Sequence, residues 1–354
     1  MERKLRVGII GTGNISNYHI NGYLKLSDRV EVVAGCDIDE PKLQAYCDRY
    51  NIPHRYTDYN EMLAKENLDC VSVCTWNAEH KNATIASLRA GANVICEKPM
   101  AMNAKEAEEM KAVAVETGRI LQIGFVQRFA QDTAVLRDFI DKDLFGKIYY
   151  AKASYLRRSG CPGGWFGDKT RSGGGPLVDL SVHVLDLVRY LSGLPKPISA
   201  YGEIFDNLGP NRAAGGEMTW SVSKETTDPY NVEDFATALI KFDNGLVVAL
   251  ETSFNLNVKK DYTNVQLFGT KAGSTIEPNM EIYTQYGDRF VNLEPATPVP
   301  SEDDELFDRE IKGFIDAVEG VEPCRATPDD GIMIMKIIDA VYESARIGKS
   351  VEIQ

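Results

Sequence analysis

The chain of 354 residues is long enough for about two domains, since domains average roughly 150 residues. Its 52 acidic and 39 basic residues give a formal net charge of −13, which argues against a protein that binds nucleic acid or anionic lipid through clustered cations. We expect no membrane span or secretory leader, and a cytoplasmic protein whose seven cysteines are reduced core thiols.

The first 125 residues alternate strand-like and helix-like segments. Apolar, strand-like runs are expected at residues 5–10, 30–36, 54–56, 70–75, 93–96 and 119–125. Helices are expected between them at residues 15–25, 41–50, 59–65, 80–90 and 104–117. Continuously apolar strands alternating with helices predict an α/β domain with a parallel, doubly wound sheet.

The pattern changes after residue 125. The expected elements are a helix at 132–141, a strand at 147–156, a glycine-rich loop at 159–175, a helix at 176–191, and closing helices at 305–318 and 329–347. Long strands fill the region between residues 198 and 293, where Asp243-Asn244-Gly245 predicts a hairpin turn. We therefore predict an α/β domain at 1–123 and an α+β domain at 124–354, the second built on a large, mostly antiparallel sheet.

A glycine-rich turn follows the first strand, in the pattern G-x-G-x-x-S. Gly11 permits the tight turn, Gly13 lets the backbone approach a pyrophosphate, and the next helix presents its free N–H groups. The strand–turn–helix context strengthens a motif that alone is weak. We predict a dinucleotide-binding domain whose phosphate contacts come from Gly11, Thr12, Gly13, Asn14 and Ile15.

An acidic residue, Asp37, ends the second strand. Asp37 could be an ordinary turn residue. After a strand–turn–helix unit with a glycine fingerprint, however, a carboxylate at this position would accept hydrogen bonds from the adenosine ribose and repel a 2′-phosphate. No lysine or arginine occupies residues 38–41, the next four positions, to attract that phosphate. The sequence therefore favours NAD over NADP.

Two further motifs carry residues suited to moving protons and stabilising charge. Glu97-Lys98-Pro99 follows the fifth strand, at the sheet edge where ligands bind in open α/β folds. Asp179 and His183 stand four residues apart, which places both on one face if the segment is helical. Individually, these residues could be a surface lysine, a capping acid and a core histidine. Together they offer a cation, a carboxylate and an imidazole that could converge on one substrate.

These motifs resemble those of the glucose–fructose oxidoreductase / inositol dehydrogenase / rhizopine-catabolism (Gfo/Idh/MocA) family, which shows the glycine fingerprint, an E-K-P motif and G-G-G-x-x-x-D-x-x-x-H in this order. The resemblance spans essentially the whole chain, and includes His19, a T-x-N-x-x-H segment at 75–80 and a junction segment at 124–129. Trp76 stands where the family usually has proline.

The resemblance implies a pyridine-nucleotide oxidoreductase acting on sugars, cyclitols or related polyols. By analogy, Lys98 contacts the reacting oxygen and the nicotinamide ribose, His183 exchanges the hydroxyl proton, and Asp179 orients both. A cis peptide is expected between Lys98 and Pro99. The remaining implied cofactor contacts are Thr75, Trp76, Asn77, His80 and Glu97.

Substrate specificity is expected to come from the 159–175 loop, where Trp165 offers an apolar plate for a sugar face or else serves as a core residue. The predicted substrate-binding residues are Lys98, Arg128, Arg157, Trp165, Asp179 and His183. No metal is expected, because no ligand spacing such as H-E-x-x-H occurs. The strands at 235–242 and 246–254 are more apolar than one buried face requires, which predicts a homodimer or homotetramer.

Two alternatives to a dehydrogenase stay open at this stage. A glycoside hydrolase that oxidises its substrate transiently with tightly held NAD would produce no net NADH. A non-catalytic dinucleotide-binding sensor is disfavoured by the presence of Lys98, Asp179 and His183 together. The sequence does not identify the sugar or the carbon that is oxidised.

Overall fold

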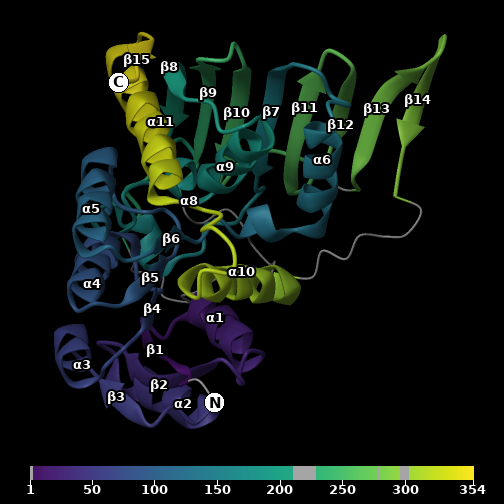
Figure 1. The fold of residues 1–354 in the computed structure, drawn as a ribbon. Coiled ribbons are helices and arrows are strands. Elements are labelled where there is room, and N and C mark those ends of the chain that lie inside the picture. Colours follow the sequence, from purple (N-terminus) through teal and green to yellow (C-terminus); the bar gives the residue numbers. More distant parts are fainter. Residues whose placement is uncertain (1–2, 210–228, 277–278, 296–302) are drawn as a thin grey trace. The chain divides into compact units, whose positions relative to one another are not determined.

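The computed structural model describes residues 3–209, 229–276, 279–295 and 303–354 (Figure 1). The chain forms two compact units, which are described separately. The first comprises residues 1–129 and 302–332, and the second comprises residues 130–301 and 333–354. Within the described ranges, no helix is both long and apolar enough to cross a bilayer.

The first unit contains a six-stranded parallel sheet in the order β3-β2-β1-β4-β5-β6. Its strands are β1 Leu5–Ile10, β2 Val30–Cys36, β3 His54–Tyr56, β4 Cys70–Val73, β5 Asn93–Cys96 and β6 Leu121–Ile123. The helices between them are α1 Asn14–Leu24, α2 Glu40–Tyr50, α3 Tyr59–Lys65, α4 Asn77–Arg89 and α5 Ala104–Thr117. This strand order is that of a Rossmann fold, so the predicted doubly wound sheet is confirmed.

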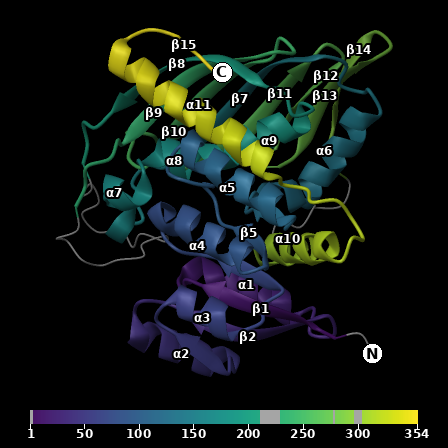
Figure 2. The ribbon, with the colours of Figure 1, turned by 60° about the vertical axis from the view of Figure 1, so that its left-hand side comes forward.

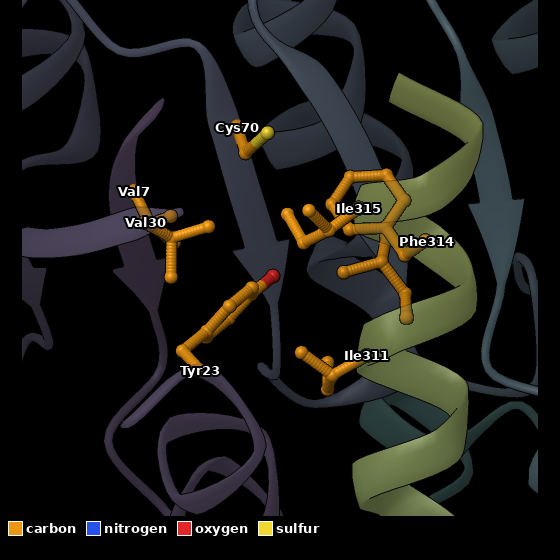
Figure 3. Close-up of a cluster of buried hydrophobic side chains, with 8 residues drawn as sticks. Val7, Tyr23, Val30, Cys70, Ile311, Phe314 and Ile315 are labelled. Carbon is orange, nitrogen blue, oxygen red and sulfur yellow. The ribbon is translucent and has the colours of Figure 1, made fainter. Parts of the chain in front are cut away.

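Helix α10 (Asp303–Val318) also belongs to the first unit, although the sequence placed this segment in the second domain. Its apolar positions Ile311, Phe314 and Ile315 are fully buried in one cluster with Val7 of β1 and Cys70 of β4 (Figure 3). Residues at this spacing share one helical face, and burying that face against the parallel sheet removes it from water. Packing between distant segments therefore assigns α10 to the first unit.

The second unit is built on a nine-stranded mixed sheet in the order β14-β13-β12-β11-β7-β10-β9-β8-β15. Only β7 and β10 pair in parallel among the described ladders of this sheet. The strands are β7 Ile148–Leu156, β8 Pro197–Phe205, β9 Phe235–Phe242, β10 Val247–Ser253, β11 Tyr262–Gly269, β12 Ala272–Thr275, β13 Glu281–Tyr286, β14 Arg289–Leu293 and β15 Val351–Glu352. The predicted large, mostly antiparallel sheet is confirmed.

Helices lie along one face of this sheet (Figure 1 and Figure 2). The helices of the second unit are α6 Gln131–Asp141, α7 Lys169–Ser172, α8 Pro176–Asp179, α9 Ser181–Leu191 and most of α11 Pro328–Ile347. Along β9 the side chains of Ala236, Ala238, Ile240 and Phe242 are buried, while Leu239 between them is 52% exposed. This alternation is expected for a sheet with one covered face.

The predicted hairpin joins β9 to β10. Gly245 has φ +87°, a conformation that glycine adopts without steric cost, and its amide donates to the carbonyl of Phe242 at 3.0 Å. The two strands then pair in antiparallel register from Lys241 with Val247 to Phe235 with Ser253. The turn residues and the alternation of side chains thus specify this ladder together.

Candidate functional site

The glycine-rich turn joins β1 to α1 at the carboxyl edge of the parallel sheet. Gly11 has φ +89°, and a Cβ atom added there would lie 2.5 Å from the carbonyl oxygen of Cys74, so a larger residue would force the two loops apart. Gly13 is the N-cap residue of α1 and provides no side chain to cover the first helical N–H groups. This arrangement matches the backbone cradle that a pyrophosphate requires.

Asp37 follows β2 and is bound firmly to this turn. Its Oδ2 accepts hydrogen bonds from the Thr12 amide at 2.8 Å and the Thr12 hydroxyl at 2.9 Å, and its Oδ1 accepts one from the Asp39 amide at 3.0 Å. Burial alone would raise the pKa of Asp37, but the Asp39 and Thr12 amides and a neighbouring ammonium group outweigh it and hold the pKa below its usual range. The carboxylate is therefore ionised at neutral pH.

That ammonium group belongs to Lys42, which the sequence reasoning missed. Its Nζ lies 3.0 Å from Oδ2 of Asp37 and 3.9 Å from where a Cβ of Gly13 would stand. Lys42 is the fifth residue after Asp37, and the first turn of α2, which begins at Glu40, brings it back onto the carboxylate. A cation is therefore present beside the glycine turn, contrary to the expectation from the sequence.

The loop after β4 was expected to contact a cofactor through Thr75, Trp76, Asn77 and His80. Thr75 and Trp76 are half-buried, and Trp76 is the N-cap residue of α4. The His80 ring is fully buried, with Nδ1 2.7 Å from the Pro99 carbonyl oxygen and Nε2 3.1 Å from the Thr75 carbonyl oxygen. Burial lowers the pKa of His80, and a neutral ring donates its single proton to one of these two carbonyl oxygens. His80 thus connects this loop to the E-K-P segment.

The expected cis peptide between Lys98 and Pro99 is present. The preceding residue, Glu97, is 5% exposed, and its Oε1 lies 2.9 Å from Nε2 of His19 while its Oε2 accepts a hydrogen bond from the Lys98 amide at 3.2 Å. The carboxylate therefore connects α1 to the backbone of Lys98. The Lys98 side chain itself is half-buried.

A chain of buried hydroxyl groups continues beyond His19. Its Nδ1 lies 3.1 Å from Oγ of Ser72, and the Tyr23 hydroxyl lies 2.8 Å from the same oxygen. One consistent direction of donation runs from the Tyr23 hydroxyl to Ser72, from Ser72 to Nδ1 of His19, and from Nε2–H of His19 to Glu97. A serine within the otherwise apolar run of β4 was the signal in the sequence for this network.

Glu310 of α10 also lies near this network. Ligand atoms of His19, Glu97 and Glu310 all lie within 4.8 Å of one another, and the three residues are buried. Such a group could in principle hold a metal ion. The 2.9 Å contact between Nε2 of His19 and Oε1 of Glu97 already pairs two of these atoms as donor and acceptor. His19 and Glu97 therefore belong to the internal hydrogen-bond network of the first unit.

Asp179 and His183 lie in the second unit, near the start of the helical segment that was expected at 176–191. The segment divides at Leu180, so that Asp179 ends α8 and His183 lies in the first turn of α9. Asp179 is 7% exposed and His183 is half-buried. The predicted single helix is thus two consecutive helices, because the backbone at Leu180 departs from ideal helical geometry at φ −102°.

Tyr155, near the end of β7, adjoins His183, and Arg157 in turn adjoins Tyr155. The ring centroids of Tyr155 and His183 are 6.3 Å apart, and the guanidinium carbon of Arg157 lies 5.3 Å from the Tyr155 ring. Arg157 is buried and donates from NH1 to the Gly160 carbonyl at 2.8 Å. Tyr155 was not identified from the sequence, since nothing local distinguishes it from other strand tyrosines.

Cys161 is another buried group of this region. Burial raises the pKa of its thiol to about 11, and the Asp179 carboxylate acts in the same direction. The thiol is therefore protonated at neutral pH and is not a nucleophile.

Trp165, which was expected to contact a sugar face, is half-buried and stacks on Phe166 with ring centroids 3.9 Å apart.

Arg128, expected to bind substrate, has an internal role instead. Its side chain is fully buried in the first unit, where NH1 donates to the Arg325 carbonyl at 2.6 Å and to Oδ2 of Asp330 at 3.0 Å. A buried guanidinium needs such partners, because an unpaired charge away from water is costly. This internal pairing of a fully buried side chain corrects the prediction that Arg128 contacts substrate.

The candidate residues are divided between the two units. The glycine turn, Asp37 and Lys98 belong to the first unit, and Asp179 and His183 belong to the second. The convergence of Lys98 with Asp179 and His183 on one substrate stays a prediction from the sequence.

Each unit of the chain contains a segment that matches a known protein-family model. Residues 5–125 match the family model described as the oxidoreductase family, NAD-binding Rossmann fold (GFO_IDH_MocA), and residues 133–275 match the GFO/IDH/MocA C-terminal domain. The chain is 36% identical over 352 residues to D-glucoside 3-dehydrogenase of Escherichia coli K12, covering 99% of this chain and 97% of that protein.

More distant proteins resemble the chain over a similar extent. Myo-inositol 2-dehydrogenase of Thermotoga maritima is 26% identical over 359 residues, with 99% of each chain covered. A solved structure of levoglucosan dehydrogenase in complex with NADH aligns with a TM-score of 0.84 at 22% identity, covering 99% of this chain and 100% of that one. At 22% identity, the likeness to levoglucosan dehydrogenase shows a shared fold.

Proposed function

The chain belongs to the Gfo/Idh/MocA family of NAD-binding oxidoreductases, and from this premise we propose that it transfers a hydride between a secondary ring hydroxyl of a glucoside or related sugar and the nicotinamide of NAD. The single observation that supports this substrate class best is the 36% identity with a D-glucoside 3-dehydrogenase along nearly the whole chain. Cyclitols and other polyols are the neighbouring candidates, since a myo-inositol dehydrogenase is also a relative.

The residues around the glycine turn fit the dinucleotide. The Gly11 position admits no side chain, Gly13 leaves the first turn of α1 uncovered, and the ionised Asp37 can accept hydrogen bonds from ribose hydroxyls. When bound, NAD supplies the hydride acceptor at its nicotinamide ring. The protein's own groups must supply the proton transfer and the stabilisation of charge.

We assign these tasks to three residues. His183 accepts the proton of the substrate hydroxyl, because a neutral imidazole titrates near the working pH, at roughly 6.5 when unperturbed. The Lys98 ammonium stabilises the negative charge that develops on the same oxygen, and in the reverse direction polarises the ketone. Asp179 orients the imidazole and a neighbouring substrate hydroxyl. Trp165 and Arg157 are proposed to contact the rest of the sugar.

The test is an NAD⁺-reduction screen over glucosides, free aldoses, cyclitols and sugar acids, with NADH followed by absorbance. Turnover of a sugar or cyclitol with stoichiometric NADH supports the proposal. Release of the aglycone from a glucoside without net NADH would instead indicate the hydrolase that uses NAD transiently. Binding of NAD without turnover of any member of the panel would contradict an enzyme of this substrate class.

The open face of the nine-stranded sheet supports a proposal about assembly. Tyr201 of β8 lies directly opposite Leu239 of β9, and both are about half exposed, at 46% and 52%. Further along the same ladder, Phe205 and Phe235 stack with ring centroids 5.5 Å apart. Apolar side chains gathered on one face favour association. We propose a homodimer or homotetramer formed through this face. A monomer found by light scattering at micromolar concentration would contradict this proposal.

We also propose a cytoplasmic location. All seven cysteines are free, and six of them are buried, as expected for a protein kept in a reducing compartment. Fractionation of the native host with thiol labelling would test this proposal. Recovery of the protein in an oxidising compartment would contradict it.

A further inference from the structure

A buried carboxylate, Glu233, lies directly beneath the glycine triplet that precedes Asp179 and His183. It is 5% exposed and stands just before β9. Its Oε1 accepts hydrogen bonds from the amides of Gly175 and Leu177, both at 3.0 Å, and Oε2 lies 3.0 Å from the same Gly175 amide. Sequence reasoning did not single out Glu233.

A second residue holds this carboxylate from the other side. The hydroxyl of Tyr342, on α11, donates to both oxygens of Glu233, at 3.0 and 3.1 Å. Tyr342 is half-buried, and burial of its hydroxyl together with the neighbouring Glu233 raises its pKa, so it remains a donor. Burial raises the pKa of Glu233, and the donors from Gly175, Leu177 and Tyr342 act against this effect by binding its two oxygens.

The glycine triplet allows the backbone to approach this pair. A Cβ atom added at Gly174 would stand 1.9 Å from the Tyr342 hydroxyl oxygen, and one added at Gly175 would stand 2.3 Å from the carbonyl oxygen of Glu233. Neither contact is sterically possible. The second and third glycines of the motif are therefore required because the chain lies directly on Glu233 and Tyr342.

The contacts of Glu233 with Tyr342, Gly175 and Leu177 form a clamp. This clamp holds the start of the segment that carries the candidate catalytic groups. Leu177, whose amide Glu233 binds, lies two residues before Asp179, and the Thr252 hydroxyl binds the adjacent Pro176 carbonyl at 3.0 Å. The Ser181 hydroxyl donates to the carbonyl of Leu177, which joins α8 to α9. Each of these bonds restricts where Asp179 and His183 can lie relative to the sheet.

We propose that Glu233, held by Tyr342, is the positioning residue for Asp179 and His183. This inference rests on the catalytic roles proposed above. In this role Glu233 fixes the turn at Gly175–Leu177, which leads into the helices that carry Asp179 and His183. Misplacement of a catalytic group by about 1 Å can cost on the order of 10²-fold in rate, so a bond made several residues away can control turnover.

The substitution Glu233→Gln preserves size but removes one acceptor. A carboxamide offers one acceptor oxygen in place of two: when that oxygen stays on the Gly175 and Leu177 amides, the NH₂ group faces the Tyr342 hydroxyl, which must change from donor to acceptor. We expect kcat to fall by about 10- to 100-fold. The dissociation constant of NAD should not change, because the glycine turn and Asp37 belong to the other unit. The primary deuterium isotope effect on kcat should rise, since the chemical step becomes slower.

Two further variants complete the test. Tyr342→Phe removes the hydroxyl but leaves the backbone donors, so kcat should fall by about two- to tenfold. Glu343→Gln is the matched control, because this neighbouring carboxylate is on the same helix but exposed, pairs with Arg346, and should leave kcat unchanged. The melting temperature of each variant is measured alongside the kinetics.

A lower kcat and a larger isotope effect in Glu233→Gln, with unchanged NAD binding, support positioning. Values equal to those of Glu343→Gln overturn it. Should Glu233→Gln fail to fold, Tyr342→Phe decides in the same way: a lowered kcat supports the inference and a wild-type kcat overturns it.

Hydrogen exchange separates this inference from the proposed function. If the wild-type protein oxidises no sugar, the proposed function fails, and amide exchange over residues 175–183 decides the anchoring alone. Faster exchange there in Glu233→Gln than in Glu343→Gln supports the clamp, and equal exchange overturns it.

Discussion

Replacement of Lys42 by methionine should sharpen the preference of the protein for NAD over NADP. The two cofactors differ by a 2′-phosphate that carries about −1.5 to −2 charges at neutral pH. The ionised Asp37 repels this group, whereas the Lys42 ammonium, 3.0 Å from that carboxylate, attracts it. The observed selectivity is the difference between the two effects.

The magnitudes follow from Coulomb's law. Two unit charges at about 5 Å interact by roughly 0.8 kcal/mol in water and about 3 kcal/mol at an effective dielectric of 20. The Lys42 side chain is 45% exposed and belongs near the lower limit, whereas Asp37 is 9% exposed and belongs nearer the upper one. Repulsion by Asp37 therefore dominates, and we expect at least about tenfold higher kcat/KM with NAD, or roughly 1.4 kcal/mol.

Removal of the weaker, attractive effect should raise this ratio. Lys42→Met is expected to increase the NAD preference by about fivefold, corresponding to roughly 1 kcal/mol at the exposed limit. Asp37→Asn should reduce the preference by more, because it removes the less exposed charge. The assay is kcat/KM for NAD and NADP measured side by side in each variant.

Lys65→Met serves as the control, since this exposed lysine pairs with Glu61 on α3 and should leave the ratio unchanged. A wild-type preference for NADP would refute the assignment of Asp37. A ratio unaltered by Lys42→Met would show that the Lys42–Asp37 pair does not face the adenosine ribose.

The remaining predictions concern catalysis and stability. His183→Ala should lower kcat by ~10²–10⁴ with NAD binding unchanged, whereas Lys98→Met should lower kcat and also weaken NAD binding measured by fluorescence quenching; near-wild-type turnover of His183→Ala would return it to a structural role. Burial lowers the pKa of His80 below its unfolded value of roughly 6.5. Below about pH 6.5 the unfolded chain therefore binds a proton at His80 that the native state does not bind, and the free energy of unfolding should fall as pH falls. His80→Gln should lose this part of the acid sensitivity, as compared by melting temperatures at about pH 7.5 and 5.5. His19→Ala should lower the free energy of unfolding by about 1–3 kcal/mol in denaturant titrations, because it leaves Glu97 buried without its imidazole donor; a change below about 0.5 kcal/mol would show that this bond contributes little.

Features that depend on neighbouring residues were predictable from the sequence. The alternation of apolar strands and helices specified the parallel sheet, and Gly245 specified the hairpin through its positive φ. The glycine turn at Gly11 and the cis bond before Pro99 were likewise indicated by local motifs. Hydrophobic period, turn chemistry and motif spacing act over a few residues, so a single sequence displays them.

Contacts between distant segments were decided only by the tertiary structure. Helix α10 joins the first unit because Ile311 and its neighbours bury their side chains on a sheet formed by residues far earlier in the chain, among them Val7 and Cys70. Arg128 became a buried ion pair with Asp330, and Glu233 came to lie beneath Gly175. None of these partners is visible in a local pattern, because burial and hydrogen bonding across the fold select them. The sequence thus determines which chemical groups the protein possesses, and packing determines which of them are left to face a ligand and which hold the others in place.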